Sequence, residues 1–182
     1  MIRLIEVEPR PSGVMARTSG RGTGLREFAL KLDALYAPDL YTWTVLDVGG
    51  GDAWFYEFYP WHKYYSLDPR TLSESEEKKE CSIRGVSEFL PFHDASVDLL
   101  VSKQTLVHFT DPIQACAEMC RVSRRAIVIR QEFPESPIGW KGHSRVQIDS
   151  PIDILSVFDD LGWVSRYDGT DFIVSRGILN VL

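Results

Sequence analysis

Residues 44–53 read Thr-Val-Leu-Asp-Val-Gly-Gly-Gly-Asp-Ala, and this stretch decides the fold of the chain. The apolar run of Val45, Leu46 and Val48 is typical of a buried parallel strand, and the three glycines behind it predict a tight turn. Glycine has no Cβ and adopts positive φ, so a ligand can lie directly on the backbone there. Asp47 adds a carboxylate near the end of the strand. The pattern is typical of a nucleotide-binding site.

The spacing of the glycines distinguishes two classes of nucleotide site. A dinucleotide-binding turn has the pattern Gly-x-Gly-x-x-Gly, and Trp54 stands where the third glycine belongs after Gly49 and Gly51. The pattern Asp-x-Gly-x-Gly-x-Ala, from Asp47 to Ala53, resembles motif I of class I S-adenosylmethionine-dependent methyltransferases. A nicotinamide enzyme is therefore the less favoured alternative.

Three further blocks of sequence follow the order of that family. Residues 63–68 (Lys-Tyr-Tyr-Ser-Leu-Asp) resemble its second strand, which ends in an acid that binds the ribose of the cofactor. A carboxylate has two acceptor oxygens and suits a vicinal diol. Residues 85–102 resemble the family's Leu-Pro-Phe segment and fourth strand, and His108 continues the pattern. The resemblance is closest to the small-molecule methyltransferases of ubiquinone and menaquinone biosynthesis, and it covers roughly residues 44–130.

The resemblance implies S-adenosyl-L-methionine as cofactor and S-adenosyl-L-homocysteine as product. His108, after the fourth strand, is the candidate general base because imidazole titrates near neutrality, and packing or capping is the competing interpretation. Val86 stands where an acid commonly binds the adenine, so Ser87 and Glu88 are the expected substitutes. No metal is expected. The expected cofactor contacts are Asp47, Gly49, Gly50, Gly51, Trp54, Asp68, Pro69, Ser87, Glu88 and Ser102.

The pattern along the chain predicts a single α/β domain over residues 25–182. Apolar spacing predicts an amphipathic helix over residues 25–36, and the pairs Asp111-Pro112 and Ser150-Pro151 are N-cap signals that begin two more helices. Strands alternate with these helices, and residues 163–176 are predicted to form a closing hairpin. We expect a Rossmann-like, doubly wound, mostly parallel sheet with a C-terminal antiparallel hairpin.

Three segments outside this regular pattern are candidates for contacts with substrate. Residues 1–24 are rich in arginine and glycine and are expected to form a flexible basic leader, either an arm that folds over a substrate or a solvated tail. Residues 53–59 are predicted to form a short aromatic helix after the glycine loop. Residues 132–149 are predicted to form the longest loop, where such folds place substrate contacts.

Composition favours an acidic globular protein over a nucleic-acid or membrane protein. The 182 residues carry a formal net charge of −6, and no apolar run approaches the length of a membrane span. Cys81, Cys116 and Cys120 lack paired metal spacing and are expected to be small buried hydrophobic residues in a reducing cytoplasm. We expect a cytoplasmic enzyme that acts on a small molecule, with a homodimer as one way to cover an apolar face.

Two alternatives to a small-molecule enzyme stay open. Val86 and the compact turn Ser123-Arg124-Arg125, where the family usually has Pro-Gly-Gly, also suit a non-catalytic S-adenosylmethionine-fold partner or regulatory protein. An RNA methyltransferase would rely on the arginines of the leader and bind RNA with salt-sensitive affinity. The chain has no Asn-Pro-Pro-Tyr loop after the fourth strand and no Pro-Cys pair, which argues against methylation of exocyclic base amines or pyrimidine carbons.

Overall fold

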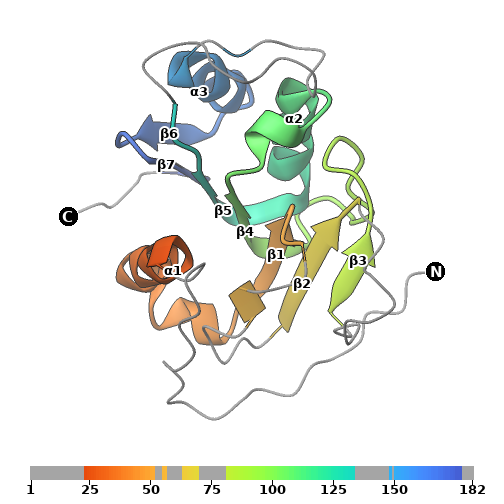
Figure 1. The fold of residues 1–182 in the computed structure, drawn as a ribbon, viewed down its shortest axis with the longest axis vertical. Helices are drawn as coiled ribbons and strands as arrows, with labels where there is room; N and C mark the ends of the chain where they lie inside the picture. The colour runs from red at the N-terminus through yellow and green to blue at the C-terminus, as the bar shows by residue number, and fades with distance from the viewer. Residues whose placement is uncertain are drawn as a thin grey trace.

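A computed structural model of the chain describes residues 23–51, 55–56, 63–69, 81–133, 148 and 150–177. A seven-stranded sheet in the order β3-β2-β1-β4-β5-β7-β6 runs through it (Figure 1). The strands are β1 (Thr44–Val48), β2 (Lys63–Asp68), β3 (Ser82–Arg84), β4 (Val97–Lys103), β5 (Ser123–Arg130), β6 (Val164–Tyr167) and β7 (Asp171–Ser175). The helices are α1 (Thr23–Tyr36), α2 (Pro112–Val122) and α3 (Pro151–Asp160), with short 3-10 helices η1 (Asp39–Tyr41) and η3 (Leu106–His108).

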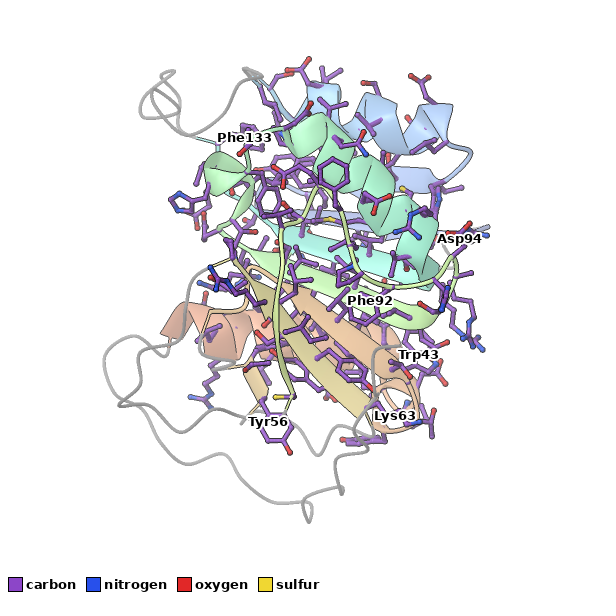
Figure 2. The ribbon with its side chains drawn as sticks, turned by 90° about the vertical axis from the view of Figure 1, so that its right-hand side faces the viewer. Trp43, Tyr56, Lys63, Phe92, Asp94 and Phe133 are labelled. Atoms are coloured by element: carbon purple, nitrogen blue, oxygen red, sulfur yellow. The ribbon has the colours of Figure 1, made fainter. Side chains whose placement is uncertain are left out.

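The first five strands are parallel, and the last two form an antiparallel hairpin. β1 pairs in parallel with β2 and β4, β2 with β3, and β4 with β5, whereas β7 is antiparallel to both β5 and β6. Parallel neighbours bring their carboxyl ends to one edge of the sheet, which we call the carboxyl edge. Figure 2 shows Trp43 and Lys63, at the amino ends of β1 and β2, on the opposite side from Phe133, which follows β5. The predicted α/β sheet with its closing hairpin is confirmed.

Helices cover both faces of the sheet. In Figure 1, α1 lies on one side of the strands, and α2 and α3 lie on the other. Phe28 and Leu32 of α1 are buried in one core with Val128, while Met119 of α2 and Phe158 of α3 are buried in a second core with the neighbouring strand residue Ile127. Successive side chains of a strand point to opposite faces, so the same strands supply both cores.

Helices α2 and α3 begin at the residues that their N-cap signals predict. Asp111 Oδ1 accepts a hydrogen bond from the Gln114 N–H at 3.0 Å, which satisfies one of the unpaired amides at the start of α2. Ser150 and Asp153 form a capping box at the start of α3, and Gly162 follows its end with φ +78°. Helix α1 begins at Thr23, two residues before the predicted start, so it includes the last residues of the predicted leader.

Two connections are tighter than the sequence predicts. Strand β3 is three residues long instead of the six expected over residues 81–86, because a turn closed by the Phe89 N–H and the Val86 carbonyl follows it. Strand β5 begins at Ser123 directly after α2, and the Ser123 hydroxyl donates to the Ala126 carbonyl at 2.8 Å. The predicted turn at Ser123-Arg124-Arg125 is therefore wrong: these residues are the start of β5, and this hydrogen bond stabilises them.

Several predicted segments lie outside the described residues. They are the leader up to residue 22, most of the aromatic segment 53–59, and most of the loop 132–149. The three cysteines are described, and each is buried and outside any disulfide, as predicted. Burial raises the pKa of Cys120 to about 12 and that of Cys116 further. Within the described part of the chain, none of the helices is long and apolar enough to cross a membrane.

Candidate functional site

The glycine loop leaves the end of β1 at the carboxyl edge of the sheet. Gly49 and Gly51 have φ values of +77° and +55°, which favour glycine. A Cβ on Gly49 would lie 2.4 Å from Cγ2 of Thr105, and one on Gly50 would lie 2.6 Å from Oδ2 of Asp47. Both distances are well below van der Waals contact, so a side chain fits at neither position. The fold itself therefore requires these two glycines, and their backbone stays partly exposed.

Asp68 is the last residue of β2, and its carboxylate reaches the glycine loop. Its Oδ2 accepts a hydrogen bond from the Gly51 N–H at 3.1 Å, and the residue is only 8% exposed. The backbone carbonyl of Asp68 accepts from the Gly85 N–H at 3.2 Å, which fixes the residues after β3 beside it. Pro69, next in the chain, is exposed. The structure thus brings Asp68 to the glycine loop.

Asp47 is buried beside the loop with an unusual electrostatic environment. Its Oδ2 accepts a hydrogen bond from the Tyr64 hydroxyl of β2 at 2.5 Å. Burial raises the pKa of Asp47 to about 7 despite the hydrogen bond from Tyr64, and the negative charge of Asp68 adds to the rise. The positive charge of Lys103 lowers the pKa, but within the described ranges Asp47 forms no direct ion pair with Lys103 or with any other residue. A positively charged ligand beside this carboxyl group would favour its ionised form and lower its pKa.

The end of β4 supports the glycine loop from the other side. Ser102 is fully buried, and its hydroxyl donates to the Val48 carbonyl at 2.9 Å. The same hydroxyl forms a second hydrogen bond with the Thr105 hydroxyl. Because Thr105 packs on Gly49, Ser102 acts as a positioning residue that fixes the ends of β1 and β4 together. Sequence reasoning selected Ser102 but missed Thr105.

Ser87 and Glu88 follow β3, and both are buried. The Ser87 hydroxyl donates to Glu88 Oε2 at 2.9 Å, and Glu88 Oε1 accepts from the backbone N–H groups of Thr110 and Asp111 at 2.7 and 3.0 Å. The Glu88 carboxylate therefore joins the residues after β3 to the residues just before α2. A carboxylate near a helix N-terminus is favourable, because unpaired amides and the helix dipole both face it. The sequence did not indicate this second role of Glu88.

A second clamp holds the same loop further along. Arg121 of α2 donates to the carbonyls of Leu90 and Phe92 at 3.0 and 2.9 Å, and Glu118 accepts from the Leu90 N–H at 2.9 Å. Arg121 also pairs with the exposed Asp94 at 2.7 Å. In Figure 2, Phe92 lies against the interior and Asp94 points away from it. Residues 85–96, which we call the β3–β4 loop, are therefore attached to α2 at both ends.

His108 ends the short helix η3, and its side chain is exposed. Its backbone N–H donates to the Thr105 carbonyl at 2.8 Å, so the turn after β4 fixes its position at the carboxyl edge. The structure therefore places His108 on the side of the sheet where the loop acids lie. Trp54, the remaining expected contact, lies outside the described residues.

Residues 46–126, somewhat less than half of the chain, match the family model described as a methyltransferase domain. The match is to a methyltransferase domain, and the seven-stranded sheet with its antiparallel hairpin has the fold of class I S-adenosylmethionine-dependent methyltransferases. No curated protein sequence matches the chain. The match is to methyltransferase domains in general and does not distinguish the ubiquinone and menaquinone enzymes from others.

Solved structures share the architecture of this methyltransferase domain. The Haloferax volcanii protein solved in complex with the Trm112 methyltransferase activator has a TM-score of 0.63 and 17% identity, covering 85% of this chain and 92% of that one. Magnesium protoporphyrin IX methyltransferase of Synechocystis PCC 6803, solved with bound SAM, has a TM-score of 0.64 and 14% identity, covering 87% and 80%. YcgJ of Bacillus subtilis has a TM-score of 0.59 and 19% identity, covering 78% and 68%. At such identities the likeness shows the fold.

Proposed function

We propose that the methyltransferase domain transfers a methyl group from S-adenosylmethionine to a small-molecule acceptor. The observation that carries this proposal is the pair of acids, Asp47 and Asp68, which lie buried on either side of a glycine loop that has no room for side chains. S-adenosylmethionine supplies a methyl group that is already activated on a positively charged sulfur. The protein therefore has to bind, orient and shield the reactants more than it has to activate them.

The residues of the loop fit this cofactor. Its amino group and sulfonium are cations, and Asp47 is a buried carboxyl group without an ion pair among the described residues. Asp68 uses Oδ2 to accept from Gly51, and a carboxylate has further lone pairs that suit the donors of a ribose diol. Gly49 and Gly50 bring backbone rather than side chains to the cofactor. We assign cofactor binding to Asp47, Gly49, Gly50, Gly51, Trp54, Asp68, Pro69, Ser87, Glu88 and Ser102.

His108 is the proposed general base for an acceptor that must lose a proton. Its side chain is exposed at the carboxyl edge, after the central strand β4. Imidazole can accept a proton near neutral pH without a large change in its environment. An acceptor whose nucleophile carries no such proton needs only positioning, and His108 would then be dispensable.

The ion pairs of Arg130 and Lys31 at the carboxyl edge favour a small acceptor over a nucleic acid. A phosphate-binding surface needs lysines and arginines with uncompensated charge. Arg130 is already paired with Asp171 at 2.7 Å, and Lys31 is paired with both Asp168 and Asp171. The net charge of −6 acts in the same direction. An RNA methyltransferase remains the second candidate function only through the arginines of the leader.

Calorimetric titration with S-adenosylmethionine and S-adenosylhomocysteine tests the cofactor assignment. We expect micromolar binding of both, about −8 kcal/mol, and a loss of about tenfold or more in Asp68→Asn. Asp98→Asn is the matched control, because Asp98 is equally buried (8% exposed) but accepts from the Thr44 N–H at the opposite edge of the sheet. Wild-type binding in folded Asp68→Asn, or no binding by the wild-type protein, would contradict the assignment.

The class of acceptor is tested with tritium-labelled S-adenosylmethionine and a cell extract separated into low-molecular-mass, RNA and protein fractions. We expect the label to appear in the low-molecular-mass fraction, and His108→Gln to slow its incorporation while S-adenosylhomocysteine binding is unchanged. Label in the RNA fraction, with binding that weakens as salt rises, would replace the small-molecule proposal by the RNA alternative.

A further inference from the structure

Gln104 follows β4 directly and has a strained backbone. Its φ is +56°, a conformation that residues other than glycine rarely adopt outside functional sites and tight turns. Its backbone N–H donates to the Arg130 carbonyl at 2.7 Å, so the neighbouring strand β5 fixes this conformation. The strained residue lies at the carboxyl edge, between the glycine loop and the end of β5. The half-buried side chain of Gln104 is therefore presented beside the proposed cofactor site.

A second glutamine determines which way the Gln104 amide faces. Gln131 Nε2 donates to the Glu132 carbonyl and to Gln104 Oε1, both at 3.1 Å. The Glu132 carbonyl can only accept, so the Gln131 amide must turn its nitrogen toward it. The same nitrogen can only donate to Gln104, so Gln104 must turn its oxygen inward. The orientation of both amides therefore follows from the Glu132 carbonyl, which can only accept a hydrogen bond.

The hairpin at the end of the chain holds Gln131 in place. Gln131 is only 2% exposed, and its backbone N–H donates to the Thr170 carbonyl at 2.9 Å. The hydroxyl of Tyr167 on β6 lies 3.2 Å from the Gln131 carbonyl oxygen. A side chain so confined cannot turn its amide over without losing both of its hydrogen bonds. Gln131 is therefore a rigid support for Gln104.

The outward-facing group of Gln104 is its Nε2, which has two N–H donors. Among the described residues, no group accepts a hydrogen bond from it. We propose that Gln104 Nε2 donates a hydrogen bond to an oxygen atom of the methyl acceptor, and that Gln131 is the positioning residue that keeps this donor facing outward. The inference rests on the proposed methyl transfer, and it gives the acceptor a chemical class: a molecule with a carboxylate or carbonyl oxygen near the methylated atom.

The neighbouring charge agrees with an oxygen-bearing acceptor. Lys103 precedes Gln104 at the end of β4, and within the described ranges it forms no ion pair. Its side chain lies near the start of α1, where a Cβ on Gly24 would be 3.6 Å from Lys103 Nζ. A positive charge at the same edge of the sheet as a fixed N–H donor favours an oxygen acceptor and disfavours a cationic one.

Selective labelling of glutamine side chains with nitrogen-15 allows a direct test by NMR. The protein is first saturated with S-adenosylhomocysteine, which tests the cofactor site separately, and is then titrated with benzoate or with benzylammonium. We expect benzoate to shift the side-chain amide signals of Gln104 and to leave those of Gln114, which is exposed on α2, unchanged. Benzylammonium should shift neither pair of signals.

Gln104→Glu sharpens the test because a carboxylate still accepts from Gln131 but turns an acceptor outward. We expect benzoate affinity to fall about tenfold or more and benzylammonium to begin to bind, as for loss of a hydrogen bond and a change of charge. Gln114→Glu makes the same chemical change on the surface of α2 and should change neither affinity. Gln131→Met should weaken benzoate binding through loss of the fixed amide, with S-adenosylhomocysteine affinity unchanged.

Several results would overturn the inference. Equal benzoate affinity in the wild-type protein and Gln104→Glu would do so, as would a wild-type protein that binds neither probe. If Gln131→Met does not fold, Gln104→Glu decides alone. Failure of S-adenosylhomocysteine to bind would instead count against the proposed function, so the two failures are distinguishable.

Discussion

Two pairs of acids lie along the carboxyl edge of the sheet, and the protein treats them differently. The hairpin acids, Asp168 and Asp171, are paired with cations: Arg130 makes two hydrogen bonds to Asp171, at 2.7 and 2.9 Å, and Lys31 contacts both acids. The loop acids, Asp47 and Asp68, accept hydrogen bonds from uncharged donors, a tyrosine hydroxyl and a backbone amide. The hairpin acids therefore form ion pairs with named cations, whereas Asp47 accepts its hydrogen bond from an uncharged group.

The pKa values follow this difference. Partial burial alone would raise the pKa of Asp168, but the Lys31 ammonium and the N–H groups of Thr170 and Asp171 outweigh it and lower the pKa. Burial raises the pKa of Asp47 to about 7. Asp168 therefore contributes to stability at pH values above its ordinary pKa, because its ionised form is favoured on folding. Ionised Asp47 lowers the stability of the fold, and a cationic ligand beside it would offset that loss.

The largest expected effect is the removal of a hairpin acid. Asp171→Ala leaves Arg130 buried without its partner, so we expect the free energy of unfolding to fall by about 3–5 kcal/mol. Chemical denaturation measures this change, and S-adenosylhomocysteine affinity should be unchanged at temperatures where the variant is folded. Asp160→Ala, at the exposed end of α3, is the control and should have little effect. Loss of affinity in folded Asp171→Ala would remove the distinction between the two pairs.

Substituting alanine for glycine should have different effects in the glycine loop and in the turn after α3. Gly49 and Gly162 have nearly equal φ values, +77° and +78°, but a Cβ on Gly162 has no neighbour within 4 Å. We expect Gly162→Ala to lose only about 1–2 kcal/mol of stability, from backbone strain. Gly49→Ala adds a clash with Thr105, and we expect S-adenosylhomocysteine affinity to fall about a hundredfold, which corresponds to about 3 kcal/mol. Equal effects of the two substitutions on stability and binding would show that the loop is not specially packed.

Cofactor binding should depend on pH through Asp47. Folding raises the pKa of Asp47 from its ordinary value of 3.8 to about 7. The contribution of this group to stability is therefore fully present below pH 3.8 and is lost as the pH rises from 3.8 to about 7. Binding of the cation S-adenosylmethionine favours the ionised form, so affinity should rise up to about tenfold between acid and mildly alkaline pH. Calorimetry across this range measures the rise, together with release of a proton on binding. Asp47→Asn should abolish the dependence, and a pH-independent wild-type affinity would contradict the raised pKa.

The smallest expected effect concerns the hydroxyl that faces Asp47. Tyr64→Phe removes its hydrogen bond, so the pKa of Asp47 should rise further and the pH midpoint of binding should move upward. We expect a loss of about 1 kcal/mol in cofactor binding at neutral pH. Tyr36→Phe is the matched control, because the buried Tyr36 hydroxyl has no hydrogen-bond partner in the described part of the chain. That control should be neutral or slightly stabilising.

The strands, the caps and the glycine loop could be predicted because their signals are local. The run Thr44–Val48 with three glycines, and the capping pairs before α2 and α3, each contain the chemistry that determines their conformation. The same locality allowed Asp47 and Asp68 to be selected, since each lies at the end of a predicted strand. The structure brings both to one loop.

The partners of these residues could not be predicted because they depend on strand register and packing. Tyr64 reaches Asp47 only because β1 and β2 pair with Asp47 opposite Ser66. Gln131 reaches Gln104 because Lys103 pairs with Arg130 in the adjacent strands. A single sequence gives the strands but not their register, so it shows a candidate residue without the group that orients it.

The β3–β4 loop and α2 are joined by Glu88 at one end and by Arg121 and Glu118 at the other. This double attachment makes them one cooperative unit, so the Leu90 and Thr110 amides should exchange with solvent deuterium at rates set by opening of the whole unit. A loop that moves only when α2 unfolds with it is not suited to be the route by which a ligand enters or leaves. S-adenosylhomocysteine would then leave, and S-adenosylmethionine enter, past other segments around the site, while the β3–β4 loop stays attached to α2.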